Sequence, residues 1–533
     1  MMMTTPGIPE AAPLGWQTQQ QYWGRYFEQR LYTQLRWAVE HARASRHDPV
    51  YLQRHWESFL TLLRKSRQKS KLHPLSLDLI TALHPWPLRW GYWADWKREC
   101  RFAAQVSAEM HLPAQQAAFL GYLSGILFAI GQVDEATKTG GNALSLARET
   151  RAVSPLMNTG EILVAILLNQ GKQEAARQLL YRLDADLKQW QPHISPREYT
   201  IGWARLTLQQ TVFLRLQGRS TEAIALASQA VEGLKRLMPQ DIHLLADAHK
   251  HRATMYWAQG QYALAIRDLK YALEFYSQEG DIYAEGITSG NLGLVYWSIS
   301  ELDNAEQSLL RSVKTTEQLN ARWRLTVDVG NLGLVYLSRG QLDQALRYIQ
   351  RQISLAEQTG HFKEQVRGYD NRGIVYLMQG RLREALADFT RYSDSVKQEQ
   401  SPEGIGCGYV NLSWCYADLG ETSRAVQLAH DALAIADEIH AASLKTIALR
   451  CLAEYETGEQ KISILREALS LAKSLDRKLD EAGCCLALSA AVPLPEEKTS
   501  CWNTGVALLQ KIGATAWLKE HSPENPPRIA LML

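Results

Sequence analysis

Residues 331–345 read NLGLVYLSRGQLDQA, and this short stretch decides the fold. Two helices must cross closely where Gly333 and Ala345 stand, because both positions are small. Gly340 ends the first helix, since glycine adopts the left-handed cap conformation without a Cβ penalty. Asp343 lies in the first turn of the second helix, where a negative charge suits the helix dipole. The stretch therefore predicts two antiparallel helices joined by a tight turn.

This pattern recurs with a constant step of 40 residues. Tyrosine, alanine and asparagine each keep the step: Tyr256, Tyr296, Tyr336, Tyr376 and Tyr416; Ala265, Ala305, Ala345, Ala385 and Ala425; Asn291, Asn331, Asn371 and Asn411. The same glycine-to-alanine spacing occurs at Gly131 with Ala136, Gly171 with Ala176, and Gly218 with Ala223. A fixed period of this size indicates stacked repeats, because a single helix pair cannot bury both of its faces. We count eight clear pairs and expect a ninth, degenerate pair after His440.

The repeat resembles the tetratricopeptide repeat (TPR), whose pattern is Leu-Gly-x-x-Tyr in the first helix and Ala-x-x-x-Phe in the second. Gly293, Gly333 and Gly373 fill the small position, and Ala385 with Phe389 gives the full second-helix pair. The family's basic repeat is 34 residues long, and the closing proline is absent here. The 40-residue step is similar to the repeats of kinesin light chain and of maltose-regulator-type bacterial sensors. The resemblance implies an all-α, right-handed superhelical solenoid of antiparallel helix pairs.

The chain divides into five expected parts. They are a disordered N-terminus at 1–15, a Trp-rich helical cap at 16–89, the TPR array at 90–440, degenerate repeats and a C-terminal helical cap at 441–520, and a tail at 521–533. Eight of the 16 tryptophans fall before residue 97. An aromatic-rich cap over the first repeat is the preferred interpretation of that region. A separate binding module and an unrecognised catalytic domain are its alternatives.

Composition indicates a cytoplasmic helical protein. Fifty-eight basic residues against 56 acidic ones give a net charge of +2, so no overall field points to nucleic acid. No apolar run approaches the ~18 residues of a membrane helix. The seven cysteines form no Cys-x-x-Cys pair, which suits reduced thiols better than a disulfide framework.

Catalytic and metal-binding signatures are missing from the sequence. It contains neither a phosphate-cradling GxxxxGK[ST] loop nor an HExxH zinc motif. We therefore expect no enzyme activity, no cofactor and no metal, although a catalytic triad can assemble from distant residues. The basic run from Arg64 to Lys71 is interpreted as a solvated helix end. Nucleic-acid binding is its less favoured alternative, because no recognition module accompanies it.

The first helices of successive repeats are expected to line a concave groove, as the family resemblance implies. Asn291, Asn331, Asn371 and Asn411 occupy a position that in several relatives bonds a peptide backbone. An amide offers both a donor and an acceptor, so it pairs with an extended peptide. The alternative is that the asparagines bond across to the adjacent repeat and set the stacking. The sequence favours neither interpretation over the other.

Apolar residues stand at fixed offsets from these asparagines. Leu294, Leu334, Ile374 and Trp414 follow by three residues, and Trp297, Leu337 and Leu377 follow by six. Offsets of three place them on the same side of the helix as the asparagines. Arg367 is the one charge expected in the groove. It lacks the paired lysines of carboxylate-clamp adaptors, so the predicted partner is a protein or peptide with an apolar or amphipathic segment.

Three functions follow from the sequence, in order of preference. The first is a non-catalytic scaffold or adaptor that binds a peptide or partner protein in its concave groove. The second is a regulatory or sensor subunit whose N-terminal region docks a separate effector, such as an ATPase or a transcription factor. The third is an enzyme with an unrecognised N-terminal site. Repeat folds host many roles, so the groove itself has to decide between them.

Overall fold

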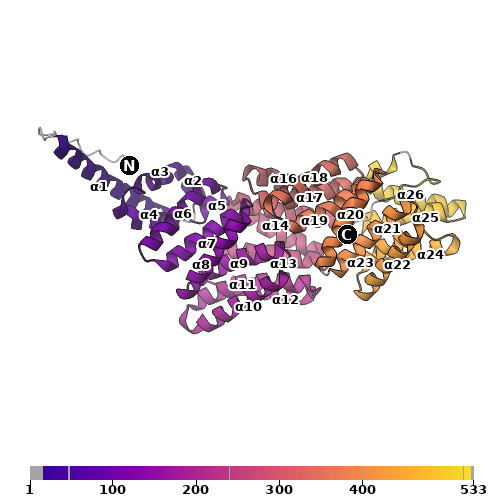
Figure 1. The fold of residues 1–533 in the computed structure, drawn as a ribbon, viewed down its shortest axis with the longest axis horizontal. Coiled ribbons are helices and arrows are strands. Elements are labelled where there is room, and N and C mark those ends of the chain that lie inside the picture. The colour runs from indigo at the N-terminus through magenta and orange to yellow at the C-terminus, as the bar shows by residue number, and fades with distance from the viewer. Residues whose placement is uncertain (1–15, 46–47, 239–240, 400, 520, 530–533) are drawn as a thin grey trace.

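The computed structural model describes residues 16–45, 48–238, 241–399, 401–519 and 521–529. The expected disordered segment 1–15 and the last four residues of the tail lie outside this range. Every regular element in the described residues is a helix, so the all-α prediction is confirmed. Figure 1 shows an elongated array, with α1 (Trp16–Ala44) projecting at one end and α24 to α26 at the other.

Ten successive helix pairs make up the array. They are α7 (Pro113–Ala129) with α8 (Val133–Glu149), α9 (Val153–Asn169) with α10 (Gln173–Trp190), α11 (Pro196–Leu216) with α12 (Ser220–Lys235), α13 (Ile242–Ala258) with α14 (Tyr262–Glu279), α15 (Ile282–Ser298) with α16 (Leu302–Gln318), α17 (Arg322–Ser338) with α18 (Leu342–Thr359), α19 (Phe362–Met378) with α20 (Leu382–Gln398), α21 (Pro402–Asp418) with α22 (Thr422–Glu438), α23 (Ala442–Leu452) with α24 (Gly458–Ser474), and α25 (Lys478–Ala491) with α26 (Pro495–Lys511).

The residues that the sequence assigns to helix ends and to the helix crossing occupy those places in the structure. Gly340 has a φ of +75° just after α17, which is the left-handed conformation that ends a helix. Asp343 lies in the first turn of α18. A Cβ on Gly333 would come within 2.8 Å of Cγ1 of Ile349. The crossing of α17 and α18 therefore requires the small residue of the motif.

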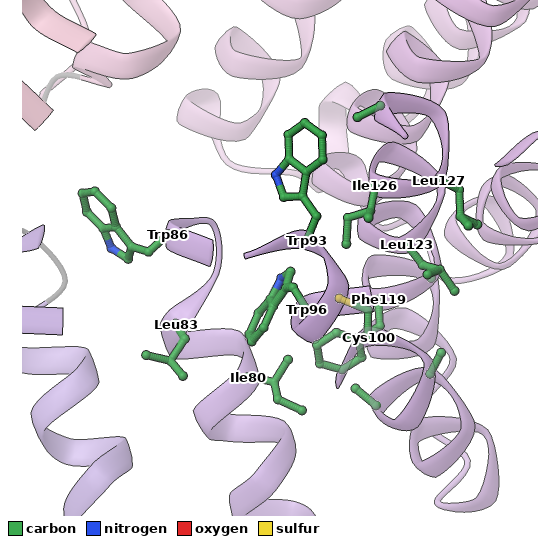
Figure 2. Packing of buried hydrophobic residues seen from close by; sticks show 14 of the residues in the cluster. Ile80, Leu83, Trp86, Trp93, Trp96, Cys100, Phe119, Leu123, Ile126 and Leu127 are labelled. Atoms are coloured by element: carbon green, nitrogen blue, oxygen red, sulfur yellow. The ribbon is translucent and has the colours of Figure 1, made fainter. Parts of the chain in front are cut away.

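The helices before the array pack into its first pairs. They are α1, α2 (Pro49–Arg54), α3 (Trp56–Ser66), α4 (His73–Leu83), α5 (Trp86–Arg89) and α6 (Trp93–Glu109). Trp56, Trp86, Trp90, Trp93 and Trp96 are buried and belong to one hydrophobic cluster with α7 to α10. Figure 2 shows Trp96 between Ile80 of α4 and Phe119 of α7. These five tryptophans thus face the core.

The basic run covers the end of α3 and the connection to α4, including part of the short 3-10 helix η1 (Ser70–Leu72), and two of its side chains pair with acids on α6. Arg64 pairs with Asp95 at 3.2 Å, and Arg67 pairs with the buried carboxylate of Glu99. Part of its positive charge is therefore balanced within the fold. A solvated segment describes only the remaining lysines, Lys65, Lys69 and Lys71, which are exposed.

Successive turns of the solenoid touch each other. Nε2 of His361 on the α18–α19 connection lies 2.9 Å from Oδ1 of Asn169, a residue 192 positions earlier. The same imidazole stacks on Trp323, whose ring centroid is 4.6 Å from that of Phe128. Arg89 pairs with Asp281 at 3.5 Å. These contacts bring residues of distant repeats together across the array.

The C-terminal residues likewise contact earlier repeats at the other end of the array. Nε1 of Trp517 donates a 2.9 Å hydrogen bond to the carbonyl of Ser338, 179 residues away. The described part of the tail follows the last repeats. Arg528 pairs with Asp418 at 2.9 Å, and the carbonyl of Ile529 accepts a 3.0 Å bond from Arg450. The tail is therefore bound in cis along α21 and α23.

Candidate functional site

Three neighbouring cavities lie on the inner side of the solenoid. Their volumes are about 290, 460 and 350 Å³. The first lies against α11, α13 and α15, and the second reaches from α11 to α25. We call the third the central cavity. Its lining is Trp257, Leu294, Trp297, Leu334, Lys363, Val366, Arg367, Asp370, Asn371, Ile374, Tyr392, Glu399, Cys407, Asn411 and Ile447.

Shared residues join the three cavities. Leu294 lines both the first and the central cavity, and Trp257 and Trp297 line both the second and the central one. A cavity of ~150 Å³ holds a benzene molecule. The central cavity, at about 350 Å³, therefore has room for more than one side chain of a ligand.

Seven of the twelve predicted groove residues line the central cavity. They are Leu294, Trp297, Leu334, Arg367, Asn371, Ile374 and Asn411. Asn291 lines the first cavity together with Leu294. The first helices α15, α17, α19 and α21 thus direct these periodic positions to one interior space.

The four remaining residues lie elsewhere. Asn331, Leu337 and Leu377 are buried between helices, outside all three linings. Trp414 is buried beneath Arg528 of the tail, with the guanidinium 4.0 Å from its ring centroid.

The asparagine series divides into two halves by its bonding. Oδ1 of Asn291 accepts a 3.1 Å bond from Arg324, and Oδ1 of Asn331 accepts a 2.8 Å bond from Arg367. Each arginine stands on the next first helix along the chain. These two asparagines therefore link adjacent repeats.

Asn371 and Asn411 have different surroundings. Nδ2 of Asn371 is buried and has no hydrogen-bond partner among the described residues. The side chain as a whole is 5% exposed and lines the central cavity. Nδ2 of Asn411 donates a 2.8 Å bond to Oδ1 of Asp370. An unpaired buried amide is rare in folded proteins, and each one calls for an explanation.

Asp370 is an acidic group without a counter-charge. In the described chain its one hydrogen bond comes from Asn411, and no basic group pairs with it. Burial raises the pKa of Asp370 from 3.8 to about 7, and the Asn411 bond opposes this only in part. Desolvation without a cation is the expected cause of such a shift. The carboxyl therefore changes charge near neutral pH.

The other charged groups of the cavity interact with neighbours. Arg367 donates to Asn331 and pairs with Glu364 at 2.5 Å. Burial lowers the pKa of Lys363, while the negative charge of Glu399 opposes that change. The wall thus combines indole and aliphatic side chains with a few polar groups, the usual composition of a ligand pocket.

Sequence reasoning missed Asp370, although a signal for it existed. The residues one and two periods earlier are Gly330 and Gly290. A Cβ on Gly330 would come within 2.5 Å of the amide of Gln352, and one on Gly290 within 2.3 Å of Arg324. Asp370 therefore breaks a position that the preceding repeats keep small. Residues that depart from the repeat pattern, such as Asp370, therefore identify the cavity better than the residues that keep it.

The two halves of the asparagine series should respond differently to mutation. Asn331→Leu removes the acceptor of Arg367 in a buried site, so we expect it to lower the free energy of unfolding by about 1–3 kcal/mol. Asn371→Leu removes an amide whose Nδ2 has no partner among the described residues, and we expect a change within ~0.5 kcal/mol. Urea denaturation of the two variants measures both values. Equal losses would show that Asn371 has a structural partner.

In the part of the chain that the structure describes, no group of three or more His, Cys, Asp or Glu residues is placed to hold a metal ion. Among those same residues, none of the helices combines the length and apolarity needed to span a bilayer. The seven cysteines are free thiols.

One known protein family has a model that matches part of the chain. Residues 323–398 match the family model described as tetratricopeptide repeat. No curated protein matches the chain. The protein is thus a helical repeat protein of the TPR type, as the repeat pattern predicts.

Several solved structures are similar to the chain. A Rap protein complexed with competence and sporulation factor is 14% identical, with a TM-score of 0.43, covering 67% of this chain and 99% of that one. A Rap conjugation gene regulator in complex with the Phr* peptide is 16% identical, with a TM-score of 0.45, covering 59% and 98%. A signal transduction ATPase with a tetratricopeptide repeat sensor from Pyrococcus horikoshii is 12% identical, with a TM-score of 0.45, covering 70% and 55%. At these values the likeness concerns helical arrays alone.

Proposed function

We propose that this protein is a non-catalytic scaffold whose central cavity binds a segment of a peptide or partner protein. The observation that carries the proposal is the buried Nδ2 of Asn371, which has no hydrogen-bond partner in the described part of the chain and lies in the wall of a cavity of about 350 Å³. A backbone carbonyl of a bound segment would accept that donor and complete its hydrogen bonding.

The apolar part of the wall supports a partner with apolar side chains. Trp257 and Trp297 stand one repeat apart on α13 and α15, and Leu294, Leu334 and Ile374 lie beside them. Each indole is held by a bond to the next first helix. Nε1 of Trp257 donates to Ser298 and Nε1 of Trp297 donates to Ser338, both at 2.8 Å. Rings fixed in this way offer contact area at little entropic cost on binding.

Filling the cavity tests the proposal. Leu294 is half-buried and lines two of the cavities, so Leu294→Trp should occupy the space without breaking a core contact. Peptides are first selected from a random phage-displayed library by their binding to the wild-type protein. We expect their affinity for the Leu294→Trp variant to be at least about tenfold lower, because the bulkier wall excludes their side chains. Isothermal titration calorimetry with the synthetic peptides measures the loss.

A matched control stands on the outer face. Leu310 on α16 is 41% exposed, so Leu310→Trp adds the same bulk away from the cavity and should leave the affinities unchanged. Asn371→Leu should weaken the same peptides as Leu294→Trp. If the library yields no binders, or yields binders indifferent to both variants, the proposal is wrong.

A further inference from the structure

In the central cavity, Asp370 has no counter-charge from any residue that the structure describes. The groups facing Asp370 are Asn411 and Cys407 from α21 and Tyr392 from α20. None of these three carries a positive charge. The negative charge of Asp370 instead contributes, after burial, to raising the pKa values of Tyr392 and Cys407.

The three basic groups on the same helix are held by other residues, and Arg372 pairs with Asp388 at 2.6 Å. Arg367 is bonded to Asn331, Glu364 and the carbonyl of Val327. Lys363 lies near Glu399, whose charge favours its protonated form. One oxygen of Glu399, Oε1, is buried and has no hydrogen-bond partner among the described residues. The cavity therefore keeps acceptor capacity that the fold does not use.

Burying a carboxylate without a cation is costly, and a core position would ordinarily hold an apolar residue. The repeat itself provides such residues, because the corresponding position is Gly330 in the preceding repeat and Val410 in the following one. The carboxylate of Asp370 thus carries a desolvation cost in the free protein, which the bond from Asn411 offsets only in part. A bound cation would remove that penalty.

We infer that the ligand of the central cavity carries a cationic group, an ammonium or a guanidinium, which pairs with Asp370 while a ligand carbonyl accepts from Asn371. This inference rests on the proposed function, since it specifies the ligand of the same cavity. Adjacent positions on α19 supply both contacts, so the cation and the carbonyl belong to neighbouring groups of one segment. A lysine side chain, an arginine side chain and a free N-terminal amine all supply this chemistry.

Synthetic versions of the selected peptides test the inference. Each peptide is prepared with arginine replaced by citrulline, lysine replaced by norleucine, or the N-terminus acetylated. One of the three changes should lower the affinity for the wild-type protein by about 10- to 100-fold, the range of a charge-assisted hydrogen bond. The change that does so identifies the source of the cation.

The Asp370→Asn variant completes a double-mutant cycle. It should weaken the parent peptide by a similar factor and leave the neutralised peptide unaffected, because the lost interaction is the same one. Asp394→Asn on the exposed face of α20 changes the net charge equally and should alter neither affinity.

The pH dependence separates the sources further. Affinity of the parent peptide should increase as pH rises through about 7, where the carboxyl of Asp370 becomes ionised. An N-terminal amine loses its charge above about pH 8, whereas lysine and arginine keep theirs.

Two results would overturn the inference. If peptides bind the cavity, as their loss in Leu294→Trp shows, but tolerate all three neutralising changes, the ligand is not recognised through a cation and the proposed function stands alone. If no peptide binds, the proposed function and this inference fall together.

Discussion

Replacing Arg324 with alanine should cost about 3–5 kcal/mol of the free energy of unfolding, the penalty of leaving a buried carboxylate without its partner. Arg324 pairs with Asp328 at 2.8 Å, and the carboxylate of Asp328 is fully buried. Ser312 donates a 2.7 Å bond to the same group. Arg324 also donates to Asn291 and to the carbonyl of Ile287. One side chain therefore joins α15 to α17.

The loss of stability in Arg324→Ala should be confined to nearby repeats and should depend on pH. Repeats in a solenoid contact mainly their neighbours, so hydrogen exchange should accelerate in α15 to α18 before it does so elsewhere. Burial raises the pKa of Asp328 despite Arg324. A carboxyl with a raised pKa binds a proton in the folded state first, so the variant should be less impaired at about pH 5 than at about pH 8.

Two further variants check this explanation. Arg322→Ala removes an exposed arginine from the same helix and should change the free energy of unfolding by less than ~0.5 kcal/mol. Adding Asp328→Asn to Arg324→Ala should restore part of the stability, because it removes the stranded charge. Similar small effects for both arginine variants would contradict the assignment.

Replacing Asp370 with asparagine should instead stabilise the free protein above neutral pH. The difference between the pKa of about 7 in the folded chain and the ordinary value of 3.8 corresponds to at most ~4 kcal/mol at about pH 8. Asparagine has nearly the same shape and keeps a carbonyl oxygen for the amide of Asn411. The gain therefore comes from removing the cost of a buried charge.

The sign of the pH dependence follows from linkage. Between about pH 4 and pH 7 the folded carboxyl is protonated while the unfolded one is ionised, so the stability of the wild-type protein falls as pH rises through this window. Asp370→Asn should abolish that slope, and its advantage should shrink as pH is lowered. Thermal or urea denaturation over this pH range measures the effect. The exposed control Asp394→Asn should show no such pH-dependent gain.

If Asp370→Asn stabilises the free protein and also weakens peptide binding, these opposite effects would connect the prediction to function. A group that destabilises the free protein and strengthens ligand binding is typical of a functional site. If Asp370→Asn lowered the stability at about pH 8, the carboxylate would have an internal partner, and the inference of a cationic ligand would lose its basis.

The local sequence pattern was sufficient to predict the helices and their ends. Gly340 and Asp343 mark the boundary between two helices because capping and the helix dipole act over a few residues. The small positions Gly333 and Ala345 set the crossing within a pair for the same local reason. Seven of the predicted groove residues do meet at one cavity, since a constant period places equivalent side chains on equivalent faces.

The bonding of individual groove residues could not be predicted in this way. Asn331 and Asn371 are equivalent in the sequence, yet one accepts a bond from Arg367 and the other has an unpaired Nδ2. The difference arises because the following repeat carries Cys407 where an arginine would be needed. Trp414 likewise has the sequence position of a groove residue but is covered by Arg528 of the tail.

The amino-acid sequence by itself determined the helix pairs, their number in the central run and the faces that their periodic residues occupy, because these depend on contacts within a repeat and its neighbour. Only the tertiary structure decided which distant parts of the chain meet. His361 meets Asn169, and Trp517 meets Ser338, through small rotations that add up over many repeats. No local pattern encodes that sum, and the bonding around Asp370 likewise depends on which side chains the neighbouring repeats place against it.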